Sequence, residues 1–509
     1  MGDARAGAYS IAIANGRALV ALSAADAVTD DLTRRRILEA PIAGAVFRFG
    51  APLALAMVLQ VLFNLVDQYL IARLPPSVSD PSLDALGICD MVAALGTILS
   101  YGVSTGTATL IAQHKGAGET ASVSRVAWAS VGMVIALGLA FALVGVLGAD
   151  VIVHDLLGAK GAVRALARDY LRVILGGSAT VFVMFQITAV ERALGNSRLP
   201  LVMIVVGNVL NLFLAVLLVY GPGEAPTVFS WGPPIARALG VPRLEVVGAA
   251  WATVIARAVA CALPLFWLRK KLDVEAHGAA LIPPREVARK VVSLAWPTSA
   301  QFVVRIAAVL LVIGLVHHEY TTREDSTAGT AYALCLRLET MALFVSMGWG
   351  GCAQTFVGMC LGAGNAARAR QAGWITGAYN VLTMTLLAVA FVYAGRAALG
   401  VFTESARVLD LAEGYLSRVG PSYTLFGFAI VLGNAVLGAG ASRMALKIDA
   451  LLVGAVQLPL MLAVVALAHA RIETLWNSIV VVNVVTAVVY AVVFRRGEWE
   501  RFAITKAVA

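Results

Sequence analysis

The segment Gln-His-Lys-Gly-Ala-Gly at residues 113–118 closes a long apolar stretch, and its Gly-Ala-Gly end returns 246 residues later as Gly362-Ala363-Gly364. Four further residue pairs keep an offset of 245 or 246: Pro52 and Pro297, Trp128 and Trp374, Tyr170 and Tyr415, and Ser197 and Ser442. A near-constant offset over half of the chain indicates an internal duplication, and its one-residue drift indicates a loop insertion. Both copies hold several long apolar runs, so the sequence predicts a duplicated membrane domain, which is typical of carriers.

The composition supports a membrane protein, because 60% of the 509 residues are hydrophobic and only 14% are charged. Runs of about 20 apolar residues predict bilayer-spanning helices. We expect an all-α integral membrane protein with about twelve spans, at 46–71, 86–110, 124–147, 171–193, 199–220, 246–268, 293–316, 329–358, 371–394, 414–437, 445–468 and 475–494. These spans leave no room for a soluble catalytic domain, so we do not expect an enzyme.

Basic residues lie at alternate ends of the predicted spans, and the opposite loops are richer in acid. The net charge of +9 is therefore spread along one membrane face and does not form a nucleic-acid site. The positive-inside rule places both termini in the cytoplasm. Six spans per copy give the copies the same orientation, so they are predicted to be parallel repeats. The expected parts are a tail (1–40), an N-terminal lobe (41–268), a cytoplasmic linker (269–292), a C-terminal lobe (293–496) and a C-terminal tail (497–509).

The glycine-rich turns do not have the sequence of a phosphate loop or a dinucleotide fingerprint. We interpret Gly116, Gly118, Gly362 and Gly364 as structural turns at helix ends, where another backbone passes closely. The histidines and cysteines have no spacing typical of a metal site, and no cofactor is expected. Transport work would then have to draw on an ion gradient or on the gradient of the substrate.

Polar residues in the first span form the best candidate site. Gln60, Asn64 and Asp67 are spaced i, i+4 and i+7, which places them on one helix face. Insertion of a charged residue into a bilayer costs about 2.5–3.5 kcal/mol, so such a residue needs a reason to be there. A carboxylate flanked by two amides is suited to binding a cation or a proton, whereas the alternative is a polar seam packed on a neighbouring helix.

Other polar residues lie within later spans. Asn208 and Asn211 share a face of the fifth span, and interhelical hydrogen bonding would explain them equally well. The seventh span has Arg305 near its centre and Gln301 one turn earlier. We expect Arg305 to face the interior or water, and pairing with a carboxylate and solvation by backbone carbonyls explain it equally well. Three sites near predicted span ends are interpreted as anchors whose side chains reach the membrane surface: Glu191-Arg192, Arg257 and Asp449.

Several motifs resemble those of the multidrug and toxic compound extrusion (MATE) transporters over about residues 40–496. The resembling segments are LFNLVDQYLIA (62–72), STGTATLIAQHKGAG (104–118), ERALGNSRLP (191–200), and AYALCLRLET (331–340) with QTFVGMCLGAG (354–364). The last two look most like the prokaryotic DinF-like branch. No single motif is specific, but their order, spacing and duplication together indicate this family.

The resemblance implies two lobes that open as a V, exchanging amphipathic, often cationic compounds for protons or sodium ions. By position, Asp67 would be the coupling carboxylate and Asn211 the amide that accompanies it. From their places on the helix faces we add Asn64 to the ion-coupling residues, and we expect four polar residues to line the substrate cavity: Gln60, Asn208, Gln301 and Arg305. We therefore expect a monomeric antiporter in a bacterial inner membrane, whose partners are a small molecule, protons and the lipid bilayer.

The sequence departs from this family at three positions. Ala215 replaces a second carboxylate that commonly follows Asn211 by four residues in the DinF-like branch. Arg305 and Gly427 stand where the NorM-like branch has acidic residues in the seventh and tenth helices. With Asp67 as the only charged ligand, protons are favoured over sodium, since a hard cation requires several oxygens. The alternative function is a flippase for a lipid-linked sugar or head group, which an inward-facing Arg305 would suit.

Overall fold

The computed structural model describes residues 32–272, 280–322, 324–400, 402–466 and 471–504. Its first half forms a bundle of eight helices, which we call the N-terminal bundle: α2 (Ile42–Ala72), α3 (Pro76–Ala117), α4 (Thr120–Val151), α5 (Gly161–Gly176), α6 (Ser178–Ala193), α7 (Arg198–Tyr220), α8 (Gly232–Leu239) and α9 (Glu245–Lys271).

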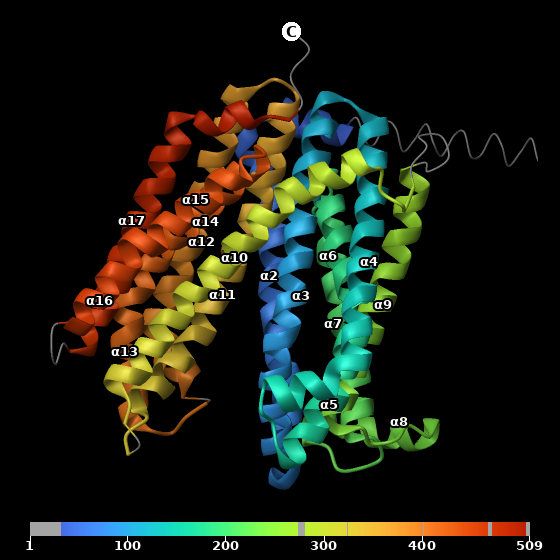
Figure 1. Cartoon of the computed structure of the whole chain (residues 1–509), viewed down its shortest axis with the longest axis vertical. Coiled ribbons are helices and arrows are strands. Elements are labelled where there is room, and N and C mark those ends of the chain that lie inside the picture. The colour runs from blue at the N-terminus through green and yellow to red at the C-terminus, as the bar shows by residue number, and fades with distance from the viewer. Residues whose placement is uncertain (1–31, 273–279, 323, 401, 467–470, 505–509) are drawn as a thin grey trace, which may run out of the picture.

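The second half forms the C-terminal bundle: α10 (Arg285–Tyr320), α11 (Thr327–Gly362), α12 (Ala366–Leu399), α13 (Ala406–Val419), α14 (Tyr423–Gly438), α15 (Ser442–Leu451), α16 (Leu458–Ala466) and α17 (Ile472–Arg496). Figure 1 shows the two bundles side by side, joined near one end and spread apart toward the other. The all-α membrane fold predicted from the sequence is therefore confirmed.

Among the described residues, eleven helices are long and apolar enough to cross a bilayer, or twelve if the bent pair α5 and α6 forms one span. Large apolar side chains on their outer faces remain exposed, including Leu143 (62%), Leu147 (73%) and Leu386 (65%). Such exposure would favour aggregation in water, but it is expected where lipid covers the helix. The fold is therefore that of a multi-pass membrane protein.

The predicted spans differ from the helices in length and continuity. The 42 residues of α3 measure about 63 Å at 1.5 Å per residue, about twice the thickness of the hydrocarbon core. The predicted span 171–193 is bent by 43° at Gly177, between α5 and α6. The predicted span 414–437 lies within Ala406–Gly438, which continues as one span through a 3-10 turn at Gly420–Ser422. The two irregular points are again about 245 residues apart, as expected for a duplication.

Two helices of the C-terminal bundle begin with ordinary capping chemistry. Pro284 precedes α10, and its missing N–H group is tolerated at a helix start. The Asn365 side chain caps α12 by accepting a hydrogen bond from the Arg368 amide at 2.9 Å. Because α9 ends at Lys271 and α10 begins at Arg285, the interval between the bundles is shorter than the segment 269–292 expected as a linker.

The duplicated glycine turns lie where the two bundles meet. Gly118 and Gly364 have positive φ angles of 80° and 74°, which glycine adopts without steric cost. Gly116 and Gly362 allow a reciprocal close approach of α3 and α11. A Cβ on Gly116 would lie 2.0 Å from the Met359 carbonyl oxygen, and one on Gly362 would lie 2.0 Å from that of Gln113.

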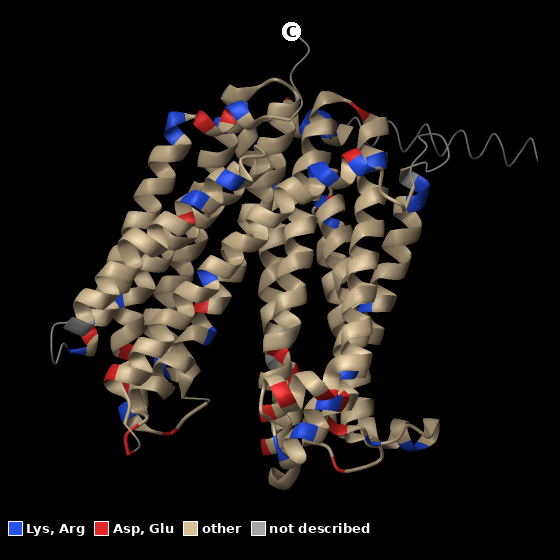
Figure 2. Ribbon diagram, in the orientation of Figure 1, with Lys and Arg blue, Asp and Glu red and all other residues tan. Residues whose placement is uncertain are grey.

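Side-chain hydrogen bonds join the bundles at the same end. Gln113 Nε2 donates to the Gly438 carbonyl at 3.0 Å, and Gln354 Nε2 donates to the Thr105 carbonyl at 2.9 Å. The backbone N–H of Ile504, after α17, donates to Gln113 Oε1 at 2.6 Å. Lys and Arg gather at this end in Figure 2, whereas acidic residues are more frequent at the other end. The bundles are therefore closed at the more basic end.

We expect Gly116→Ala to destabilise this closed arrangement, because the new methyl group would meet a backbone oxygen that cannot rotate away. Overpacking of this kind costs about 1–3 kcal/mol. The thermal unfolding midpoint of the purified protein should fall. Gly44→Ala is the control, since a Cβ there meets nothing within 4 Å. Equal midpoints for both variants would contradict the close approach of α3 and α11.

Candidate functional site

A carboxylate inside the N-terminal bundle forms the first part of the site. Asn211 of α7 donates through Nδ2 to both carboxylate oxygens of Asp67 in α2, at 2.9 and 3.2 Å. Asn211 is only 2% exposed, and its Oδ1 accepts no hydrogen bond from the described residues. The structure thus brings together two residues that lie 144 positions apart. The amide nitrogen of Asn211 binds the carboxylate, and its buried amide oxygen remains an unused acceptor.

Two further charged residues interact electrostatically with Asp67. The positive charge of Arg257 in α9 stabilises the Asp67 carboxylate, and the negative charge of Asp90 in α3 opposes it. Arg257 is half-buried, and its interpretation as an anchor stays a prediction. The sequence interpretation did not include Asp90. An acidic residue inside the apolar stretch predicted at 86–110 was the signal that could have identified it.

The remaining polar residues of the first bundle have different surroundings. Asn208 Nδ2 donates to the Leu59 carbonyl at 3.2 Å, which ties α7 to α2. Gln60 is half-buried on α2. The side chain of Asn64 lies outside the residues that the structure describes. Of the predicted ion-coupling residues, Asp67 and Asn211 are therefore the two that the structure brings into direct contact.

The C-terminal bundle has a buried polar cluster of its own. Asp449 of α15 accepts hydrogen bonds from Arg305 Nε at 2.6 Å and from Gln301 Nε2 at 2.9 Å. The Tyr490 hydroxyl of α17 donates to the other carboxylate oxygen at 2.5 Å. The interpretation of Asp449 as an anchor near a span end is therefore wrong. Its side chain is only 6% exposed and is the partner of Arg305.

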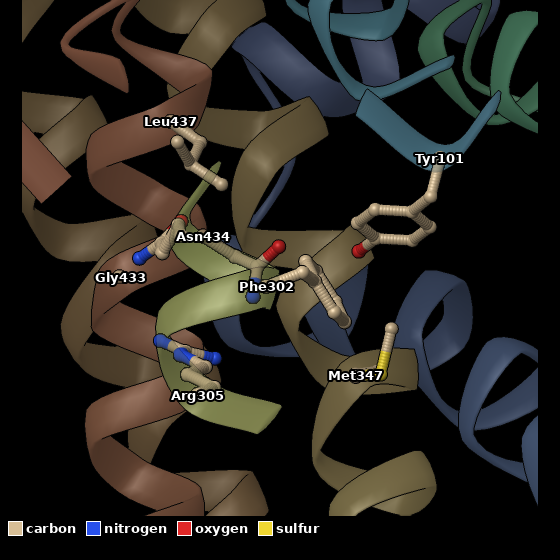
Figure 3. Close-up of a pocket in the computed structure, with 8 residues that line it drawn as sticks. Tyr101, Phe302, Arg305, Met347, Gly433, Asn434 and Leu437 are labelled. Carbon is tan, nitrogen blue, oxygen red and sulfur yellow. The ribbon is translucent and has the colours of Figure 1, made fainter. Parts of the chain in front are cut away.

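Arg305 also lines a small cavity between the bundles. The cavity has a volume of about 10 Å³, which is room for about one water molecule. Figure 3 shows Tyr101 of α3 opposite Phe302 and Arg305 of α10. The rings of Tyr101 and Phe302 meet edge to face with centroids 4.7 Å apart. The lining also includes Gln301, Met347 and Asn434.

The structure shows no group of three or more His, Cys, Asp or Glu side chains that could hold a metal ion, among the residues it describes. Its chemical features are instead a carboxylate with an amide partner in one bundle and a carboxylate paired with an arginine in the other. Together with the duplicated helical fold, these features define a two-bundle membrane carrier, in which polar groups are buried between helices.

Comparison with known proteins identifies the family of this carrier. The MatE family model matches residues 52–217 and 306–465, one segment in each copy, and the chain belongs to this family of membrane transporters. The predicted MATE resemblance is thereby confirmed. Membership in the DinF-like branch stays a prediction.

Individual relatives are distant but nearly full-length. A probable multidrug resistance protein NorM from Thermotoga maritima is 22% identical, covering 88% of this chain and 91% of its own length. An FAD transporter from Shewanella oneidensis is 24% identical, covering 79% and 84%. The fold matches that of a MOP superfamily transporter from Pyrococcus furiosus, described as having a binding pocket of reverse polarity, with a TM-score of 0.79, 20% identity and coverage of 92% and 98%.

Proposed function

We propose that this protein is a monomeric, proton-coupled antiporter that exports small amphipathic compounds across a bacterial inner membrane. The basic, closed end of the bundles faces the cytoplasm together with both termini. Residues 41–268 and 293–496 move relative to each other as the two lobes of an alternating-access carrier. The observation that carries this proposal is the hydrogen-bonded contact between Asp67 and Asn211 in the first lobe.

The Asp67 contact suits the binding and release of one proton. In the ionised form, the carboxylate accepts from Asn211 Nδ2 and is balanced by the charge of Arg257. When a proton binds, the carboxyl gains an O–H donor, and the unused Oδ1 of Asn211 offers an acceptor after a small rotation of the amide. Protonation thus changes how Asp67 is hydrogen-bonded to Asn211. If the two lobe arrangements favour different protonation states of Asp67, binding of a proton shifts the equilibrium between them.

The same geometry favours protons over sodium. Asn211 points its N–H₂ group, rather than its oxygen, at the Asp67 carboxylate. A hard cation would require several oxygens around it, and position 215, four residues later, is a buried alanine. The alternative, a flippase for a lipid-linked sugar or head group, is favoured by one observation, which is that Arg305 lines the cavity between the bundles.

Dye efflux from bacterial cells that lack their main pumps tests the proposed function. The cells are loaded with ethidium or carboxyfluorescein, and efflux is followed with and without a protonophore in sodium-free buffer. We expect the wild-type protein to export at least one of these dyes and to lose this export when the protonophore is added. Export that persists with the protonophore, or that requires sodium, would contradict proton coupling. Export of neither dye would favour the flippase.

A further inference from the structure

Arg305 presents the positive end of an ion pair to the cavity between the bundles. Its side chain is 25% exposed, whereas that of Asp449 is 6% exposed, so the carboxylate lies deeper than the guanidinium. The carboxylate is also shared with Gln301 and Tyr490. A guanidinium has five N–H donors, and the hydrogen bond to Asp449 uses Nε. Asp449 and Tyr490 therefore hold Arg305 in place, and the partly exposed guanidinium lines the cavity.

A second arginine near the cavity has no carboxylate partner. Arg192, at the end of α6, has a buried Nε with no hydrogen-bond partner in the part of the chain that the structure describes, and it forms no ion pair there. The neighbouring Glu191 carboxylate accepts from Asn196 Nδ2 at 3.1 Å. Arg192 is half-buried, so its interpretation as an anchor stays a prediction. Its buried Nε is a donor without a partner among the described residues, and an anion that binds beside it would accept that hydrogen bond.

The two arginines come from different bundles but share Tyr101 as a neighbour. Arg305 lines the cavity with Tyr101, and the Tyr101 side chain also lies within electrostatic range of Arg192. Arg192 also faces α11, because a Cβ on Gly351 would lie 2.5 Å from its Nη1. Tyr101 and Phe302 add aromatic surface between the arginines. No acidic residue lines this cavity among the described residues.

We propose that this region recognises the oxyanion of an aromatic amphiphile, so that the cargo carries a carboxylate or phosphate group rather than a positive charge. Arginine binds such oxyanions through paired N–H donors, and the aromatic rings pack against the apolar part of the cargo. The cavity has room for about one water molecule in this arrangement, so the two bundles must separate further before the acidic group of the cargo can enter. Because Arg192 and Arg305 belong to different bundles, an anion held by both would link the two bundles.

This inference rests on the proposed transport function. The efflux assay gives different results when the inference fails and when the proposed function fails. The variants are Arg305→Gln, Arg192→Gln and Arg305→Lys, and the control is Arg407→Gln, whose side chain is 81% exposed. The probes are carboxyfluorescein, an aromatic anion, and ethidium, an aromatic cation. We expect wild type and Arg407→Gln to export carboxyfluorescein, and both glutamine variants to export it at least tenfold more slowly. Arg305→Lys should retain part of the activity because the charge remains.

Ethidium export shows whether the two arginines recognise the anion or only support the fold. Ethidium export that stays the same or rises in the glutamine variants supports anion recognition, whereas an equal loss of both dyes would assign the arginines a structural role and overturn it. Proton-coupled ethidium export by the wild type without carboxyfluorescein export would overturn the inference but leave the proposed function intact. Export insensitive to the protonophore would instead remove the proposed function.

A second arm distinguishes a soluble anion from a lipid head group. Purified protein is reconstituted in vesicles that contain fluorescent phosphatidylglycerol, and dithionite quenching measures transfer between leaflets. We expect no acceleration of lipid transfer by the wild type. Transfer that depends on Arg192 and Arg305 would support oxyanion recognition but assign it to a lipid. Transfer that is unchanged in both glutamine variants, together with no effect on carboxyfluorescein, would contradict the inference.

Discussion

Asp67→Asn is expected to abolish gradient-driven export while leaving the protein folded. Asparagine keeps the shape of the side chain and can still contact Asn211, but it cannot bind and release a proton. Coupling free energies between two sites are typically 1–3 kcal/mol, so the proton-driven rate should fall to roughly one hundredth. The measurement is the initial rate of dye efflux at matched expression, with the elution profile of the purified variant as the test of folding.

Asp84→Asn is the matched control for this variant, because it makes the same change at an exposed position of α3. It should export at the wild-type rate. If Asp67→Asn and Asp84→Asn both retained the full protonophore-sensitive rate, Asp67 would have no part in coupling. Asp90, which interacts with Asp67 and Arg257, would then be the next carboxylate to replace.

The second large effect is expected at the buried ion pair of the C-terminal bundle. Asp449→Leu removes the acceptor of three hydrogen bonds and leaves Arg305 without its counter-ion. Loss of one partner from a buried pair costs about 3–5 kcal/mol. We expect a clear fall in the thermal unfolding midpoint of the protein in detergent and a lower yield.

A double variant separates the stability of this pair from its function. Arg305→Met combined with Asp449→Leu replaces both charges with apolar side chains, which is often neutral or stabilising. The double variant should recover most of the midpoint lost in Asp449→Leu, and yet export carboxyfluorescein no better than Arg305→Gln. A double variant as unstable as Asp449→Leu would mean that the two residues act independently of each other.

The sequence predicted the repeat and the spans because both depend on local composition and on one constant offset. It did not predict the bend at Gly177 or the 3-10 turn at Gly420–Ser422, because glycine and proline are tolerated in membrane helices and only packing shows where they bend. The full length of α3 was also missed. Its polar ends continue as helix beyond the apolar core that a hydrophobic run detects.

The sequence predicted which residues of the candidate site share a face of one helix. Helical periodicity placed Gln60, Asn64 and Asp67 on one face, and the family resemblance pointed to Asn211. Helical periodicity relates residues of one helix only, so it cannot predict contacts between helices. Arg305 and Asp449, which are 144 residues apart, form such a contact. Arg192 and Asp449 were therefore interpreted as anchors from their distance to a predicted span end. In the structure Asp449 is buried in the C-terminal bundle, whereas Arg192 is half-buried.

Uptake by proteoliposomes with an imposed pH difference tests proton coupling through Asp67 most directly. The wild-type protein and Asp67→Asn are reconstituted in vesicles that are acidic inside, without sodium, and uptake of ethidium and carboxyfluorescein is measured after filtration. An antiporter moves its cargo in the direction opposite to the proton, so protons leaving the vesicles should drive dye into them. The wild type should therefore accumulate at least one dye, and nigericin, which collapses the pH difference, should abolish the accumulation. Asp67→Asn should accumulate neither dye. Accumulation driven by a sodium gradient instead, or equal accumulation by both proteins, would contradict proton exchange at Asp67.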